Sequence, residues 1–173
     1  MENCTNPSYF EVEACTGGCC IKKYTGPKEG SVVIPSRLDG KEVTAIGDEV
    51  FAECGDLTGI TIPGSVTEIG SKAFAFCTGL TEITIPGSVV KIDMGAFAFC
   101  TGLTSVTIPD SVAEIGAQAF LTCDSLTSIT IPGSVAEIGM QAFDMCNLLT
   151  IHAPAGSAAE QYAEDCRIPF QPL

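Results

Sequence analysis

Residues 73–86 read AFAFCTGLTEITIP, and residues 96–109 read AFAFCTGLTSVTIP. The two stretches belong to a repeat in which a phenylalanine recurs every 23 residues and a cysteine follows three residues after it. The phenylalanines are Phe51, Phe74, Phe97, Phe120 and Phe143, and the cysteines are Cys54, Cys77, Cys100, Cys123 and Cys146. A fixed period of roughly 20–50 residues is typical of folds that stack identical units.

The residues before each repeat proline predict a short strand. In TEITIP, Ile83 and Ile85 point to one side of a strand and Thr84 to the other, which indicates that one face is buried. The proline ends the strand because it has no N–H to donate to a ladder. Six such strands are expected, at residues 32–34, 60–62, 83–85, 106–108, 129–131 and 151–153. Strands that recur in this way lie parallel, and their crossovers are right-handed in nearly all known cases.

The chain between strands also has a regular pattern. Val89 and Ile92 supply apolar contacts, glycines such as Gly70 mark a bend, and A-F-x-x-C predicts one short helical turn. Phe97 is expected to fill the core and Cys100 to pack beside it as a small apolar residue. One unit of 23 residues cannot bury its own isoleucine and phenylalanine side chains, whereas stacked units bury them against one another. The sequence therefore predicts a solenoid.

Composition narrows the possible functions. The chain has 173 residues, 46% of them hydrophobic, and its 8 basic and 21 acidic side chains give a net charge of −13. No lysine or arginine occurs between Lys91 and Arg167, which argues against binding to nucleic acid or anionic lipid. No apolar run approaches the roughly 18 residues that span a bilayer. The first residues, MENCTNPSYF, lack a secretory-signal pattern, so the expectation is a cytosolic protein or part of a longer secreted chain.

The pattern L-x-x-(I/V)-x-I-P-x-S-V-x-x-I-G-x-x-A-F-x-x-C resembles the BspA-like class of leucine-rich repeat. The first unit, IPSRLDGKEVTAIGDEVFAEC at 34–54, has a five-residue insertion that is typical of that family's opening repeat. The resemblance implies an α/β solenoid: a right-handed superhelix with a parallel strand ladder on its concave face and short helical or 3₁₀ turns on its convex face. Many members are secreted or surface proteins of bacteria and some protists that are implicated in adhesion.

Both ends of the stack are expected to be capped. Residues 1–30 contain YFEVEAC and CCIKKYTG, which predict a β-hairpin cap, and residues 31–153 form the solenoid of about five repeats. Residues 154–173 are expected to form a C-terminal helical cap. Ser157 and Glu160 have capping-box spacing, which predicts a helix at 158–165 with Tyr162 packed inward. Ile168-Pro169-Phe170 would then seal the end of a complete small domain.

The cysteines fall into two sets. The five that follow the repeat phenylalanines are interpreted as buried packing thiols. The others are Cys4, Cys15, Cys19, Cys20 and Cys166. Four of these lie in the N-terminal cap, where a disulfide is plausible if the protein is exported. A zinc site is the alternative, but C-x-x-C pairs and nearby histidines are missing, so no metal or cofactor site is predicted.

Two further patterns bear on catalysis. Glu114 and Glu137 lie one period apart, in a column with Glu68 and Lys91, and such a carboxylate pair could mimic a retaining glycosidase. We interpret them as a solvated face in a convex-side turn. His152 is the only histidine and aligns with the outward threonines, with no nucleophile identified beside it.

The predicted candidate binding face is the outward side of the strand ladder. It comprises Thr61, Glu82, Thr84, Ser105, Thr107, Ser128, Thr130 and His152. It has few of the aromatic or arginine anchors of tight interfaces, which predicts weak or multivalent binding, or a site on an end cap or loop. The leading hypothesis is a non-enzymatic module for protein interaction or adhesion at the cell surface, with a protein of a host or neighbouring cell as partner. The alternative is an intracellular scaffold.

Overall fold

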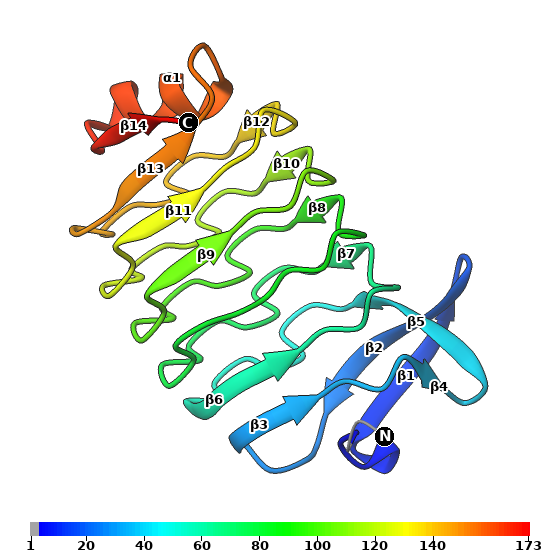
Figure 1. The fold of residues 1–173 in the computed structure, drawn as a ribbon. Coiled ribbons are helices and arrows are strands. Elements are labelled where there is room, and N and C mark those ends of the chain that lie inside the picture. The colour runs from blue at the N-terminus through cyan, green and yellow to red at the C-terminus, as the bar shows by residue number, and fades with distance from the viewer. Residues whose placement is uncertain (1–3) are drawn as a thin grey trace.

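The protein is an elongated solenoid, shown as a ribbon of the computed structural model in Figure 1. Each turn of the solenoid is one repeat and is here called a coil. The structure describes residues 4–173. Its elements are η1 (Pro7–Tyr9), β1 (Phe10–Cys15), β2 (Gly18–Tyr24), β3 (Glu29–Val33), β4 (Arg37–Leu38), β5 (Lys41–Ile46), β6 (Asp56–Thr61), β7 (Glu68–Ile69), β8 (Lys91–Ile92), β9 (Ser105–Thr107), β10 (Glu114–Ile115), β11 (Ser128–Thr130), β12 (Glu137–Ile138), β13 (Thr150–Ala153), α1 (Ala158–Cys166) and β14 (Phe170–Pro172).

One side of the stack is a parallel ladder, here called the main ladder. β3 pairs with β6, and β9, β11, β13 and β14 pair in that order. Between β6 and β9, residues 82–84 add a rung through two isolated bridges, Thr61–Thr84 and Glu82–Ser105. The isoleucines and valines next to the prolines are buried, and the threonines between them face outward. The predicted solenoid with a parallel strand ladder is confirmed.

The main ladder differs from the prediction in its details. β3, β6, β9 and β11 end one residue before the residue that precedes proline, because the proline has no N–H with which to continue the pairing, whereas β13 extends to Ala153. In the segment at 83–85, predicted as a strand, only Thr84 forms a bridge, and the second bridge of this rung is at Glu82. A seventh rung was not predicted: after Pro169 the chain runs parallel to β13 as β14. Ile168 and Phe170 do pack against the core, as expected.

A second ladder lies where the sequence suggested only a convex-side turn, and that interpretation was wrong. β5, β7, β8, β10 and β12 pair in parallel, and hairpin strands β1 and β2 extend the same sheet. Each inner rung is only two residues long, glutamate or lysine followed by isoleucine. Two residues are too short to produce a recognisable alternation. The strands form because every coil offers the same backbone groups, such as Gly70 N–H, which donates to Ile46 C=O at 2.8 Å.

The segments that contain each repeat phenylalanine, here called the return turns, are not helices. Each holds a bond between residues three apart, for example Cys54 N–H to Phe51 C=O at 3.3 Å, as in a 3₁₀ turn. In the four return turns before the last, the phenylalanine N–H donates to the next repeat, as Phe51 N–H does to Ala73 C=O at 2.8 Å. Residues two before and two after the phenylalanine have positive φ, such as 53° at Lys72 and 62° at Phe76. This left-handed backbone prevents the turn from continuing as a helix.

The core is a continuous column of aromatic rings. Phe51, Phe74, Phe97, Phe120 and Phe143 stack with centroid separations of 5.3, 5.3, 5.2 and 5.4 Å. Tyr24 of β2 packs on the first ring at 5.0 Å, and Tyr162 of α1 packs edge-on against the last at 5.8 Å. The hairpin and the helix therefore each place a tyrosine at one end of the column, and Tyr162 faces inward as predicted.

The cap elements have clear local causes. β1 and β2 pair antiparallel around the turn at Gly17, which has a φ of 84°, and β2 then lies parallel to β5. In α1, Ser157 Oγ accepts from Glu160 N–H at 3.3 Å, which confirms the predicted N-cap. The Glu160 carboxylate accepts from Gly156 N–H. The division of the chain at residues 30 and 153 stays a prediction. No helix within residues 4–173 combines the length and apolar character needed to cross a bilayer.

Candidate functional site

The candidate binding face lies on the outward side of the main ladder, along two columns. The first runs through Thr61, Thr84, Thr107, Thr130 and His152, and the second through Glu82, Ser105, Ser128 and Thr150. The structure therefore brings all eight predicted residues onto one surface. Thr150, which the sequence analysis did not include, extends the second column. Side chains in the lower-numbered rungs are exposed, and those at Ser128, Thr130 and His152 are half-buried.

The face has little charge. Between residues 82 and 153, Glu82 is the one acidic residue on the rungs of the main ladder. The only basic residues between Lys41 and Arg167 are Lys72 and Lys91, and both are engaged elsewhere. Lys72 Nζ lies 3.7 Å from Glu49 on the return turns. Lys91 Nζ lies on the second ladder, 3.6 Å from Asp93 and 3.4 Å from Glu114. No ion pair in residues 4–173 includes Glu82.

A shallow cavity of about 340 Å³, here called the mid-ladder hollow, opens in this face. It is lined by Glu82, Ile83, Thr84, Ile85, Ser105, Thr107 and Pro109. At three other rungs the residue before the proline donates its N–H to the next rung: Ile34 to Thr61 C=O, Ile108 to Thr130 C=O and Ile131 to His152 C=O, at 3.0, 3.0 and 2.9 Å. In the described chain Ile62 makes no such bond to Thr84, although a bridge between Thr61 and Thr84 still joins those two rungs. Within residues 4–173 no such bond joins Ile85 to Thr107. The two coils remain joined where Thr104 N–H donates to Thr81 C=O at 3.1 Å, and their strands separate after Glu82.

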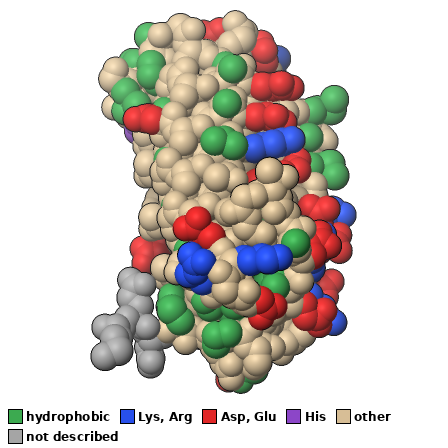
Figure 2. Space-filling model, turned by 90° about the vertical axis from the view of Figure 1, so that its right-hand side faces the viewer, with side chains coloured by type: hydrophobic (Ala, Val, Ile, Leu, Met, Phe, Trp, Pro, Cys, Tyr) green, Lys and Arg blue, Asp and Glu red, His purple; other side chains and the backbone are tan. Residues whose placement is uncertain are grey.

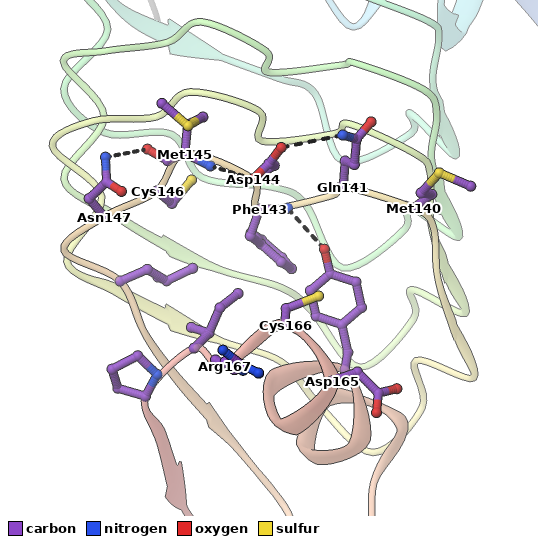
Figure 3. Close-up of a pocket in the computed structure, with 14 residues that line it drawn as sticks. Met140, Gln141, Phe143, Asp144, Met145, Cys146, Asn147, Asp165, Cys166 and Arg167 are labelled. Atoms are coloured by element: carbon purple, nitrogen blue, oxygen red, sulfur yellow. Dashed lines mark hydrogen bonds between the residues drawn. The ribbon is translucent and has the colours of Figure 1, made fainter.

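A larger cavity of about 680 Å³, the C-terminal pocket, lies between the last return turn and α1 (Figure 3). Met140 and Met145 are exposed at its rim, and Tyr162 Oη accepts from Phe143 N–H at 3.3 Å. Asp144 accepts from Gln141 Nε2 and from Met145 N–H, at 3.3 and 3.1 Å. The sequence analysis missed this pocket, because it depends on where α1 sits over the last coil.

The lining of the C-terminal pocket mixes apolar side chains with polar and ionisable ones. Its ionisable lining groups are Asp144, Asp165 and Arg167, together with Tyr162 and the thiols of Cys146 and Cys166. Burial raises the pKa of Tyr162 to about 12, so its phenol is neutral at physiological pH. The only histidine, His152, is not among the lining residues. The two thiols are candidate nucleophiles, but the lining offers them no histidine as a base.

The glutamate column weighed for glycosidase chemistry lies on the second ladder. Glu114 is paired in register with Glu137 on one side and with Lys91 on the other. The carboxylates of Asp93 and Glu114 together raise the pKa of Lys91, which holds its charge. Figure 2 shows acidic side chains interspersed with basic ones along this side of the stack. The three cavities described in residues 4–173 do not include Glu114 or Glu137.

The two cysteine sets behave differently. Those that follow the repeat phenylalanines are buried free thiols, as predicted, and from Cys77 onward each donates to a carbonyl 26 residues earlier. Cys100 Sγ, for example, lies 3.1 Å from Phe74 C=O, and burial raises its pKa to about 12. In the N-terminal cap, Cys4, Cys15, Cys19 and Cys20 are free, although a disulfide was plausible there. No group of three or more His, Cys, Asp or Glu in the described chain could hold a metal.

The ladder, the 23-residue coil and the aromatic column define a leucine-rich repeat protein. A family model described as a BspA type leucine-rich repeat region matches residues 44–163 in six copies. The chain belongs to this BspA-type leucine-rich repeat family, as its sequence pattern indicated.

Solved structures with the same fold come from several bacteria. A leucine-rich repeat protein of T. pallidum is 34% identical, with a TM-score of 0.83 over 87% of this chain and 71% of that one. A leucine-rich cell surface protein of Faecalibacterium prausnitzii is 29% identical, with a TM-score of 0.75 over 88% of this chain and 39% of that one. A protein of Bacteroides ovatus is 31% identical, with a TM-score of 0.72 over 87% of this chain and 40% of that one. The chain thus spans well under half the length of the latter two. No protein with curated annotation matches it.

Proposed function

We propose that the chain is a non-enzymatic binding module that recognises a protein ligand through the candidate binding face. The observation that carries this proposal is the register of the main ladder, which lines up outward hydroxyl groups in two columns. Hydrogen bonds fix the backbone beneath them, so the columns are preorganised and binding orders few groups. Hydroxyl groups spread along the whole ladder favour a protein partner, which can contact several rungs at once, over a small molecule that occupies one concave site.

We further propose that the module acts after secretion or at the cell surface, in adhesion or a related contact. The support is the resemblance in fold and sequence to the leucine-rich cell surface protein of Faecalibacterium prausnitzii. The net charge of −13 favours a protein ligand over nucleic acid. The buried free thiols suit an intracellular scaffold equally well, so the location of the natural protein decides between the two settings.

A binding screen with paired variants tests the role of the face. The purified, fluorescently labelled chain is applied to arrayed extracellular and bacterial surface proteins, and the hits are measured for affinity. The double variant Thr84→Arg/Thr107→Arg places two long cations on the main ladder. Ala113→Arg/Ala136→Arg adds the same charge at two exposed positions beside the second ladder, also one period apart.

The proposal requires that the first double variant lose binding to the hits while the second retains it. Thermal unfolding of both variants checks that each remains folded. Undiminished binding by Thr84→Arg/Thr107→Arg would place the contact elsewhere on the molecule and refute the proposal.

A further inference from the structure

We propose that the mid-ladder hollow is a subsite for a cationic side chain of the ligand, with arginine preferred. This inference rests on the proposed function, since it assigns a chemical feature to the protein that the main ladder binds. The hollow would then be the part of the binding face that distinguishes ligands with a suitably placed cationic side chain from those without one.

Acceptors predominate in the polar lining of the hollow. Glu82 contributes a carboxylate, and Thr84, Ser105 and Thr107 contribute hydroxyl oxygens. The separation of the two rungs leaves Thr107 C=O without the N–H of Ile85 that the regular ladder would supply. A guanidinium group carries five N–H donors in a plane and no acceptor, so it complements such a lining.

The charge on Glu82 is available for a ligand. Neither Lys72 nor Lys91 lies on the main ladder, and both are paired with carboxylates on other parts of the coil. A cation that enters the hollow therefore meets a carboxylate with no ion-pair partner in residues 4–173. Hydrogen bonds between ionised partners are roughly twice as strong as neutral ones, and a carboxylate can accept two of them from one guanidinium.

The floor of the hollow suits the apolar part of a long side chain. Ile83 and Ile85 lie in the lining and are 7% and 5% exposed, so a small part of each side chain is accessible from the hollow. Pro109 forms part of the lining beside them. The methylene groups of an arginine can lie on this floor while its head group reaches Glu82. The lining thus combines an apolar floor with a carboxylate and hydroxyl groups.

The probe is the heptapeptide acetyl-GSTRTSG-amide, compared with the same peptide carrying citrulline, which keeps the shape of arginine and removes its charge. Amide shifts of the ¹⁵N-labelled chain are followed during titration in about 150 mM salt, where long-range attraction to the acidic protein is screened. We expect saturable shifts at Ile83, Thr84, Ser105 and Thr107 with the arginine peptide, and much weaker ones with the citrulline peptide.

Two variants locate the interaction. Glu82→Gln removes the carboxylate and should raise the Kd of the arginine peptide at least about tenfold, the size of a lost charge-assisted hydrogen bond. Glu137→Gln removes the same charge from the second ladder and should leave the Kd unchanged. Equal binding of the two peptides, an unchanged Kd for Glu82→Gln, or shifts centred on Glu114 and Glu137 would each overturn the inference.

Failure of the cationic subsite can be distinguished from failure of the proposed binding face. If the peptide arms fail while Thr84→Arg/Thr107→Arg still loses the protein ligand, the cationic subsite is wrong and the binding face stands. If that double variant keeps the ligand, the face itself is wrong, whatever the peptide does.

Discussion

The hydroxyl of Tyr162 accepts a hydrogen bond from Phe143 N–H at 3.3 Å. In the preceding coil the equivalent donor, Phe120 N–H, is bound by Ala142 C=O at 2.8 Å. Tyr162 thus supplies two interactions that a further coil would otherwise make. Its ring packs against the end of the aromatic column, and its hydroxyl accepts the hydrogen bond of the last phenylalanine N–H. A side chain of α1 ends the stack with the interactions that a further repeat would have supplied.

Removing this hydroxyl should therefore destabilise the protein although the ring remains. Tyr162→Phe leaves the Phe143 N–H without its acceptor, and an unsatisfied buried donor costs about 1–3 kcal/mol. Urea unfolding monitored by circular dichroism measures the loss. Tyr9→Phe is the matched control, because the Tyr9 hydroxyl forms no hydrogen bond within residues 4–173, and it should change the free energy of unfolding by much less. Equal effects would refute the end-cap role of Tyr162.

The same hydroxyl predicts a loss of stability in alkali. Burial raises the pKa of Tyr162 to about 12, above the value of about 10 for an unfolded tyrosine. The folded state favours the neutral phenol, so this contribution is complete below about pH 10 and is lost as the pH rises through about 12. Absorbance at 295 nm should show one tyrosine fewer titrating near pH 12 in Tyr162→Phe. Titration of Tyr162 near pH 10 in the folded protein would contradict this.

Phe97→Ala should be far more damaging than Thr84→Ala. Phe97 is fully buried and stacks on Phe74 and Phe120 at 5.3 and 5.2 Å, so its loss leaves a cavity shared by two interfaces between coils. Such deletions cost about 3–5 kcal/mol. Thr84 is exposed on the main ladder, where the change should cost about 1 kcal/mol or less. Denaturant melts of the two variants decide the point, and equal destabilisation would mean that the faces are reversed.

The cysteines should separate into fast and slow thiols. Cys4, Cys15 and Cys166 are exposed and should react first with an aromatic disulfide reagent at pH 8. The five repeat cysteines are at most 7% exposed, which shields them from the reagent. Burial also raises the pKa of thiols such as Cys54 and Cys100, so little thiolate forms there, whereas a hydrogen bond with Cys123 lowers the pKa of Cys146 and leaves burial as its protection. All five should react only as the protein unfolds. Mass spectrometry of digested, labelled protein identifies each site, and rapid native labelling of Cys100 would contradict the buried arrangement.

Much of the fold was predictable because several residues in each repeat independently indicate a strand of the main ladder. In Ile83, Thr84 and Ile85 the alternation, the proline and the period agree on which side is buried. The second ladder was missed because each of its inner rungs contributes only two residues, such as Glu114 and Ile115. Its pairing arises from stacking the coils and not from a local preference.

The two cavities required the structure. TEITIP and TSVTIP carry the same pattern, so nothing in the sequence indicates that the rungs separate between Ile85 and Thr107. The two segments differ only in Glu82 in place of serine and Ile83 in place of valine. The C-terminal pocket depends on how α1 rests on the last return turn. The eight face residues were found because they follow the 23-residue period, whereas the cavities depend on backbone pairing and helix position that the period does not encode.

The identity of residues 73–81 and 96–104 has a consequence for how the molecule can change in length. Excision of residues 74–96 would join Ala73 to Phe97 and restore AFAFCTGLT without an altered junction. Phe51 could keep its donation to Ala73 C=O, and its ring would meet Phe97 instead of Phe74. The shortened protein would lose Glu82 and the hollow but retain a continuous ladder. The gain or loss of one repeat can therefore change which ligand the protein binds without changing its architecture.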